Sequence, residues 1–168
     1  MTSDISIIGG ADGPTYVFLA GELGVKWINL FGLIFIVMLL IPNIIYAIKN
    51  KDHENKCKNM VMNIMEQVGR YACMFFMVFN VGLAEFGFGS VSAFMFYMAG
   101  NIGLIIIYWI VWILYFRKHT FGKQISLAII PVCIFLFNGI MMRHLLLIFS
   151  SLLFAAGHIY VTVKKREV

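Results

Sequence analysis

The sequence predicts an all-α integral membrane protein, a bundle of about five transmembrane helices. Of its 168 residues, 61% are hydrophobic and 12% are charged, whereas a soluble domain is about 45–50% apolar and about 25% charged. The apolar residues stand in long blocks rather than in alternation. This composition excludes a soluble globule and a disordered chain. The formal net charge of +5 is therefore assigned to loops beside lipid headgroups, and no nucleic-acid partner is expected.

Five blocks are long enough to cross the bilayer, because a helix needs roughly 20 mostly apolar residues to span a hydrocarbon core of about 30 Å. They cover residues 27–48, 69–88, 91–116, 125–142 and 145–163. Only Arg143 and His144 separate the last two blocks. Ahead of the second block, apolar residues recur at helical spacing, which predicts a cytoplasmic interfacial helix near residues 52–68 that runs into the second span. A solvated loop is the alternative there.

The distribution of basic residues predicts the orientation. With five spans, eleven of the thirteen Lys and Arg residues fall on one side, and only Lys26 and Arg143 lie opposite. Cytoplasmic loops carry the excess of basic residues. We therefore expect a multi-pass protein of the cell membrane with its N-terminus outside and its C-terminus in the cytoplasm.

Residues 1–26 form a separate unit before the spanning domain of residues 27–168. Two glycines, an Asp-Gly pair and Pro14 predict a tight turn, followed by a short helix that Asp12 caps. This loop-helix element either re-enters the bilayer or lies outside it. A carboxylate, a hydroxyl and backbone carbonyls at one helix start are suited to a small cation, and a plain capped turn is the alternative. The candidate cation-binding residues are Asp12, Gly10, Gly13 and Thr15.

The string SIIGGADGPT at residues 6–15 resembles the signature of the β subunit of sodium-ion-translocating decarboxylases. In that family the motif lies in an interrupted segment within the membrane, and its Asp is implicated in sodium binding. The resemblance implies that Asp12 binds sodium and that Gly9, Gly10, Gly13, Pro14 and Thr15 shape the loop. That family has several spans before the motif, so a complete decarboxylase-driven pump is not expected from this chain alone. The rest, with IPNIIYAIKN and EQVGRYACMF, looks like small bacterial multi-pass membrane proteins of unassigned function.

Polar side chains inside the spans form a second group of candidates, because such groups usually face other helices or a water-filled cavity. Glu66 and Arg70 are spaced for an (i, i+4) ion pair. The asparagines are interpreted as interhelical hydrogen-bonding groups rather than ligands, and His158 as a snorkelling or capping residue. Arg143 and His144 are expected at the outer surface, beside lipid phosphates. The candidates are Glu66, Arg70, Asn80, Asn101, Asn138, Arg143, His144 and His158.

Two further details concern single helices. Asn43 follows Pro42 and is expected to satisfy a backbone group that the proline leaves without a partner. Ala155, Ala156 and Gly157 are small enough to let a neighbouring helix approach the last span closely.

Three functions remain open. The first is a small membrane protein that binds or conducts a cation, sodium, through Asp12. The second is an accessory or scaffolding subunit without transport activity. The third is a lipid-modifying enzyme that uses His144 or His158 with Arg143, although the sequence contains no paired membrane carboxylates and no familiar catalytic motif. No cofactor is expected other than the sodium ion of the first function. The expected partners are the bilayer and a second copy or larger membrane protein.

Overall fold

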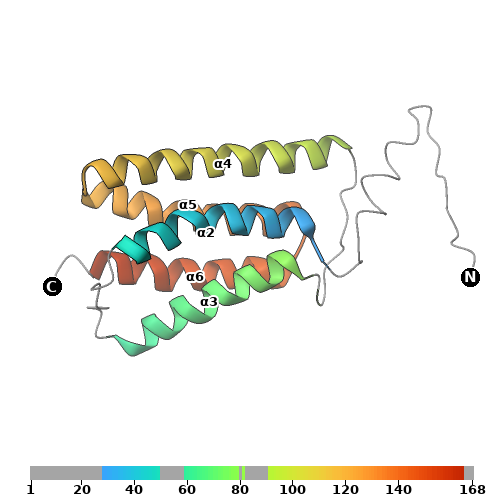
Figure 1. The fold of residues 1–168 in the computed structure, drawn as a ribbon. Coiled ribbons are helices and arrows are strands. Elements are labelled where there is room, and N and C mark those ends of the chain that lie inside the picture. The colour runs from blue at the N-terminus through green and yellow to red at the C-terminus, as the bar shows by residue number, and fades with distance from the viewer. Residues whose placement is uncertain (1–27, 50–58, 80, 82–90, 165–168) are drawn as a thin grey trace, which may run out of the picture.

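The computed structural model describes residues 28–49, 59–79, 81 and 91–164, and these form an all-α bundle. Their five helices run roughly along one common axis (Figure 1). Four of them are long and apolar enough to cross a membrane, which agrees with the integral membrane class. The helices are α2 (Leu30–Lys49), α3 (Met60–Val78), α4 (Val91–Arg117), α5 (Phe121–Met141) and α6 (Leu145–Lys164).

Helices α2, α4, α5 and α6 correspond to the first, third, fourth and fifth predicted spans. The separation of the last two spans is confirmed. Helix α5 ends at Met141, and the backbone reverses within three residues before α6 begins. Arg143 at the centre of this turn has a φ of 51°, the left-handed conformation that single residues adopt at tight helix ends.

Helix α3 differs from the prediction in where it ends. It runs continuously from the predicted interfacial segment into the predicted second span, but it stops at Val78 rather than near residue 88. Phe79 is extended and pairs with Ile28 in an isolated antiparallel bridge. Because α3 also carries Glu66 and Arg70, it is not among the four helices that are apolar enough to span a membrane by themselves.

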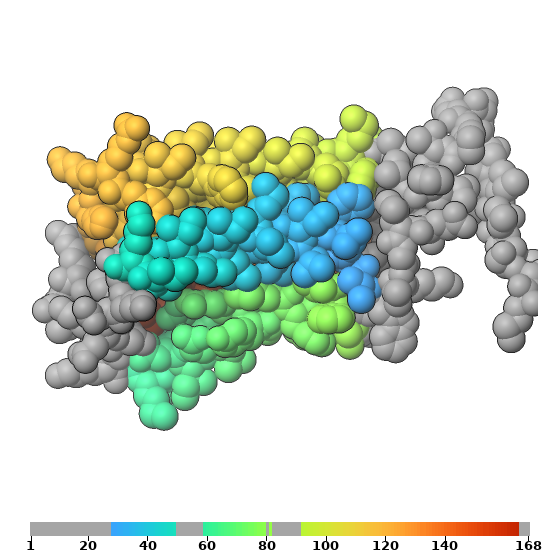
Figure 2. Space-filling view, in the orientation of Figure 1, coloured from blue at the N-terminus to red at the C-terminus, as the bar shows by residue number. Residues whose placement is uncertain are grey.

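The helices pack in a clear order of neighbours. Helix α6 is central, with α3 along one side of it and α5 along another, and α4 packs on α5. Helix α2 lies between α4 and α3 on the face shown in Figure 2 and contacts both. The core between the helices is rich in large side chains, including Met77, Tyr97 and Tyr108, each no more than 1% exposed. Outward-facing Ile, Leu, Val and Phe side chains on every helix suit contact with lipid.

Candidate functional site

Three titratable side chains meet between α3 and α6. Arg70 donates from Nη2 to Oε1 of Glu66, the predicted ion pair within α3. His158 of α6 places its Nδ1 2.9 Å from the same carboxylate oxygen. The Glu66 side chain is 8% exposed, whereas those of His158 and Arg70 are 20% and 33% exposed. A buried carboxylate requires such charged or hydrogen-bonding partners, because desolvating it alone is expensive.

Aromatic packing holds the Arg70 and His158 side chains in place. The His158 ring stacks on Phe154, one turn earlier in α6, with ring centroids 4.7 Å apart. The guanidinium carbon of Arg70 lies 6.0 Å from the centre of the same Phe154 ring. His158 and Glu66 are 92 residues apart, so their contact depends on how α3 and α6 pack and not on any local spacing. The snorkelling or capping role expected for His158 is replaced by this contact.

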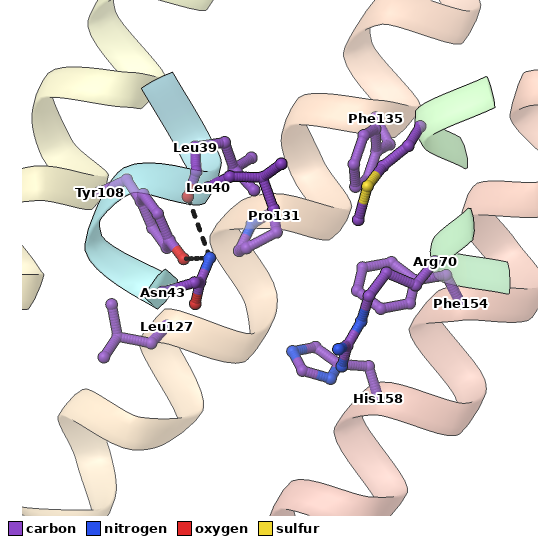
Figure 3. A pocket seen from close by; sticks show the side chains of 11 residues that line it. Leu39, Leu40, Asn43, Arg70, Tyr108, Leu127, Pro131, Phe135, Phe154 and His158 are labelled. Carbon is purple, nitrogen blue, oxygen red and sulfur yellow. Dashed lines mark hydrogen bonds between the residues drawn. The ribbon is translucent and has the colours of Figure 1, made fainter. Parts of the chain in front are cut away.

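Two adjoining cavities of about 250 Å³ each lie beside this cluster. Figure 3 shows the first, in which Arg70 and His158 lie next to each other and face Asn43 and Tyr108. Most of its remaining wall is apolar and comes from α2, α3, α5 and α6. The second shares Asn43, Arg70, Leu127 and His158 with the first. Its further polar or aromatic lining residues are Tyr46, Glu66, Trp112, Tyr115, Gln124 and Thr162.

A hydrogen-bonded pair joins α2 to α4 at the first cavity. Asn43 donates from Nδ2 to the Tyr108 hydroxyl and to the Leu39 carbonyl, both at 2.9 Å. Pro42 has no N–H, so the carbonyl four residues earlier, that of Met38, loses its helical partner. The indole of Trp109 donates to that carbonyl at 3.0 Å. Trp109 of α4, and not Asn43, therefore satisfies the carbonyl that Pro42 leaves without a helical partner.

The middle of the bundle contains a buried amide pair. Asn138 of α5 donates to Oδ1 of Asn101 of α4 at 2.7 Å, and each amide also donates to the carbonyl four residues earlier in its own helix. Both side chains are 0% exposed. The two amides therefore satisfy one another across the helix interface.

This pairing leads to a stability prediction. Asn101→Leu alone leaves the Asn138 amide buried with fewer partners, and we expect a loss of about 1–3 kcal/mol. The double variant Asn101→Leu/Asn138→Leu removes both polar groups and should recover most of that loss, because apolar residues of similar shape then pack together. Unfolding of the purified proteins in mixed detergent–SDS micelles measures the difference. A double variant that is no more stable than Asn101→Leu would contradict the pairing.

The family of the chain follows from comparison with known proteins. A family model described as vacuolar protein sorting 55, Vps55, matches residues 5–120, well over half of the sequence. The chain belongs to the Vps55 family. The matched range contains α2, α3 and α4 and ends just before α5. No curated protein and no solved structure matches the chain.

The cavities thus combine residues inside and outside the range that matches the Vps55 model. Asn43, Glu66, Arg70 and Tyr108 lie within residues 5–120, whereas His158 comes from α6. Tyr46, Trp112 and Tyr115, which line the second cavity, were not predicted from the sequence. Tyr108, Trp112 and Tyr115 are spaced four and three apart, which places them on one face of α4. That periodicity was the available signal, but it does not show which helix the face meets.

At the opposite end of the bundle, His144 is not at the lipid surface as expected. Arg143 is exposed, but His144 is 1% exposed and packs on Phe76 with ring centroids 5.5 Å apart. Its Nδ1 accepts a hydrogen bond from the Leu147 N–H at 3.3 Å, so it caps α6. His158 lies fourteen residues further along α6, which is about 21 Å in a helix. The convergence of Arg143 with His158 that the lipid-modifying enzyme required is therefore not found.

Acidification is expected to weaken this cap. Burial lowers the pKa of His144, and protonation would remove the lone pair that accepts from Leu147. The unfolded chain titrates near a pKa of about 6.5. Stability is therefore full above that pH and falls as the pH drops from there toward the lower folded pKa. Thermal unfolding of the wild type should lose several degrees more between pH 8 and pH 5 than that of His144→Asn, which caps without titrating. Equal pH dependence of the two proteins would contradict this role.

Several predicted site residues lie outside the described residues, namely Asp12, Gly10, Gly13, Thr15 and Asn80. The predicted N-terminal unit of residues 1–26 also lies outside them. Within the described helices, no three His, Cys, Asp or Glu side chains gather closely enough to hold a metal ion.

Proposed function

We propose that this chain is a non-transporting accessory membrane protein that acts in protein sorting. The observation that carries this proposal is its membership in the Vps55 family, whose description names vacuolar protein sorting. Of the three functions left open by the sequence, the accessory subunit is the one that such membership favours.

The packing of the bundle supports a scaffold. Between the cavities and the opposite end of the helices, the interior contains the Asn101–Asn138 pair together with Ile105 and Ile134, none more than 2% exposed. Amides that bond to one another and close-packed aliphatic side chains hold helices together. They do not offer the open positions that a permeating ion would need.

Loss of the gene in the native cell should disturb the delivery of a membrane cargo to its compartment, and the wild-type chain should restore delivery. The double variant Asn101→Leu/Asn138→Leu should restore it equally, because a scaffold needs the fold and not the buried amides themselves. Purification of the tagged full chain in mild detergent should retain another membrane protein. Normal cargo delivery without the gene, or purification as a clean monomer, would count against the accessory function.

We infer that the basic end of the bundle faces the cytoplasm. Lys49, Arg117, Lys118, Lys123 and Lys164 gather at the end where α2, α4 and α6 finish, while Arg143 lies at the other end. In a chain without its natural cysteines, Arg143→Cys should react with an impermeant maleimide from the non-cytoplasmic side and Lys118→Cys only after permeabilisation. The reverse pattern would overturn this orientation. Imaging of the tagged chain would distinguish the cell membrane, expected from the sequence, from a compartment on the vacuolar route.

Sodium binding through Asp12 is a second candidate, which rests on the string SIIGGADGPT at residues 6–15. In proteoliposomes, the wild type should then bind or pass sodium and Asp12→Ala should not. Indistinguishable behaviour of the two proteins would remove this candidate.

A further inference from the structure

The paired cavities have one polar and one apolar side. Leu39, Leu40, Met74 and Phe135 line the first cavity away from its polar groups, whereas most of the polar side chains line the second. Because the two share part of their walls, together they reach the lower part of the roughly 300–1,000 Å³ range of ligand pockets. Water alone suits the apolar side poorly, since a buried water needs two to four polar partners.

Arg70 brings a guanidinium to the walls of both cavities. Arg70 and His158 line both cavities, and Glu66, the acidic group of the second, accepts from both of them. Lys49 lies 5.3 Å from the ring of Phe116, which packs against Tyr46 and Trp112 of the second cavity. A guanidinium has five N–H donors in a planar fork that matches phosphate oxygens. The Arg70 side chain, 33% exposed and bonded to Glu66 through Nη2, retains capacity for such an acceptor.

The cavities lie near the basic end of the bundle, where α2, α4 and α6 finish. His158 lies six residues before the end of α6 at Lys164, which is about 9 Å along a helix. With Lys164 among the headgroups, as the basic end of a membrane helix favours, polar groups at this depth would meet the boundary between headgroups and acyl chains. Leu39, Met74 and Phe135 lie further from the basic end, and so toward the bilayer centre.

We propose that the paired cavities bind one phospholipid, with its phosphate held by Arg70 and an acyl chain against Leu39, Met74 and Phe135. The lipid would join α2 to α3, α5 and α6, the helices that supply the walls of the first cavity. The proposed lipid binding does not depend on the role of the chain in protein sorting.

Native mass spectrometry of the full chain in mild detergent, with phosphatidylglycerol added, tests the proposal. The wild type should retain one phospholipid per chain, and the lipid should raise its melting temperature. Arg70→Gln should weaken retention by about tenfold or more, since a charge-assisted hydrogen bond contributes about 1.5–3 kcal/mol. Arg117→Gln is the matched control, because it removes the same charge from an exposed site that lines neither cavity. It should bind as the wild type does.

A second variant separates binding from folding, since Arg70→Gln also removes a partner of Glu66. Leu40→Phe fills the apolar side of the first cavity and leaves Glu66, Arg70 and His158 unchanged. It should lose the lipid and keep the melting temperature of the lipid-free wild type. Inorganic phosphate that stabilises the wild type as much as phosphatidylglycerol would show an ion site and overturn the proposal. A wild type that retains no lipid, or equal loss in Arg70→Gln and Arg117→Gln, would also overturn it.

Discussion

Gly157→Ala is expected to separate α3 from α6 and to lower the free energy of unfolding by about 2–3 kcal/mol, the upper part of the range for overpacked sites. A Cβ at position 157 would lie 2.5 Å from the backbone N of Glu66 and 2.8 Å from its Cα. These are backbone atoms of a helix, so no side chain can rotate away. The whole of α3 must shift, and the contact between His158 and Glu66 shifts with it.

Unfolding in mixed detergent–SDS micelles measures the effect, with Gly103→Ala as the matched control. A Cβ at Gly103 meets nothing within 4 Å, and replacing glycine by alanine within a helix is worth about 1 kcal/mol of stability. The two substitutions should therefore change stability in opposite directions. If Gly157→Ala unfolded at the same SDS fraction as the wild type, the close packing of α3 on α6 would be wrong.

The same contact recurs one turn further along the interface. A Cβ at Gly69 of α3 would lie 2.7 Å from the backbone N and Cα of Phe154 in α6. Each helix thus presents a glycine to the backbone of the other. This reciprocal approach explains why α3, the least apolar of the five described helices, is held in the bundle.

Features that depend on a single helix could be predicted from the sequence. Block length identified the four most apolar helices, and the short polar interruption at Arg143 correctly divided α5 from α6. The Glu66–Arg70 pair follows from (i, i+4) spacing alone. The small residues around Gly157 correctly marked a face of close helix approach. Each of these inferences needs only the rise and period of a helix.

Features that depend on two helices could not be predicted in the same way. One such feature is the contact between His158 and Glu66, and another is the hydrogen bond from Trp109 to the Met38 carbonyl, which Pro42 leaves without a helical partner. Predicting either contact requires the rotation of one helix relative to the other. Many rotations bury similar apolar area when every helix is apolar on most sides, so composition does not select one. The end of α3 at Val78 was missed for a related reason: the apolar block continues past it, and the partner that terminates the helix is a distant residue, Asn29.

Asn29→Ala is expected to destabilise one end of the bundle, because this side chain serves two helix termini. Its Oδ1 accepts from the Gly32 N–H at 3.0 Å, which caps the start of α2. Its Nδ2 donates to the Met77 carbonyl at 3.3 Å, and its backbone N–H donates to the Val78 carbonyl at 2.7 Å, both at the end of α3. Asn29 is 8% exposed, so water cannot replace these bonds easily.

The expected loss is about 2–3 kcal/mol, from one cap worth about 1 kcal/mol and one buried carbonyl left short of a donor. Asn59→Ala is the matched control, since Asn59 caps only the start of α3 through a single exposed bond of 3.4 Å. It should cost about 0.5–1 kcal/mol. SDS unfolding compares the two, and amide hydrogen exchange locates the change at the start of α2 for Asn29→Ala. Equal losses in both variants would mean that Asn29 is an ordinary cap and that α2 and α3 are joined by packing alone.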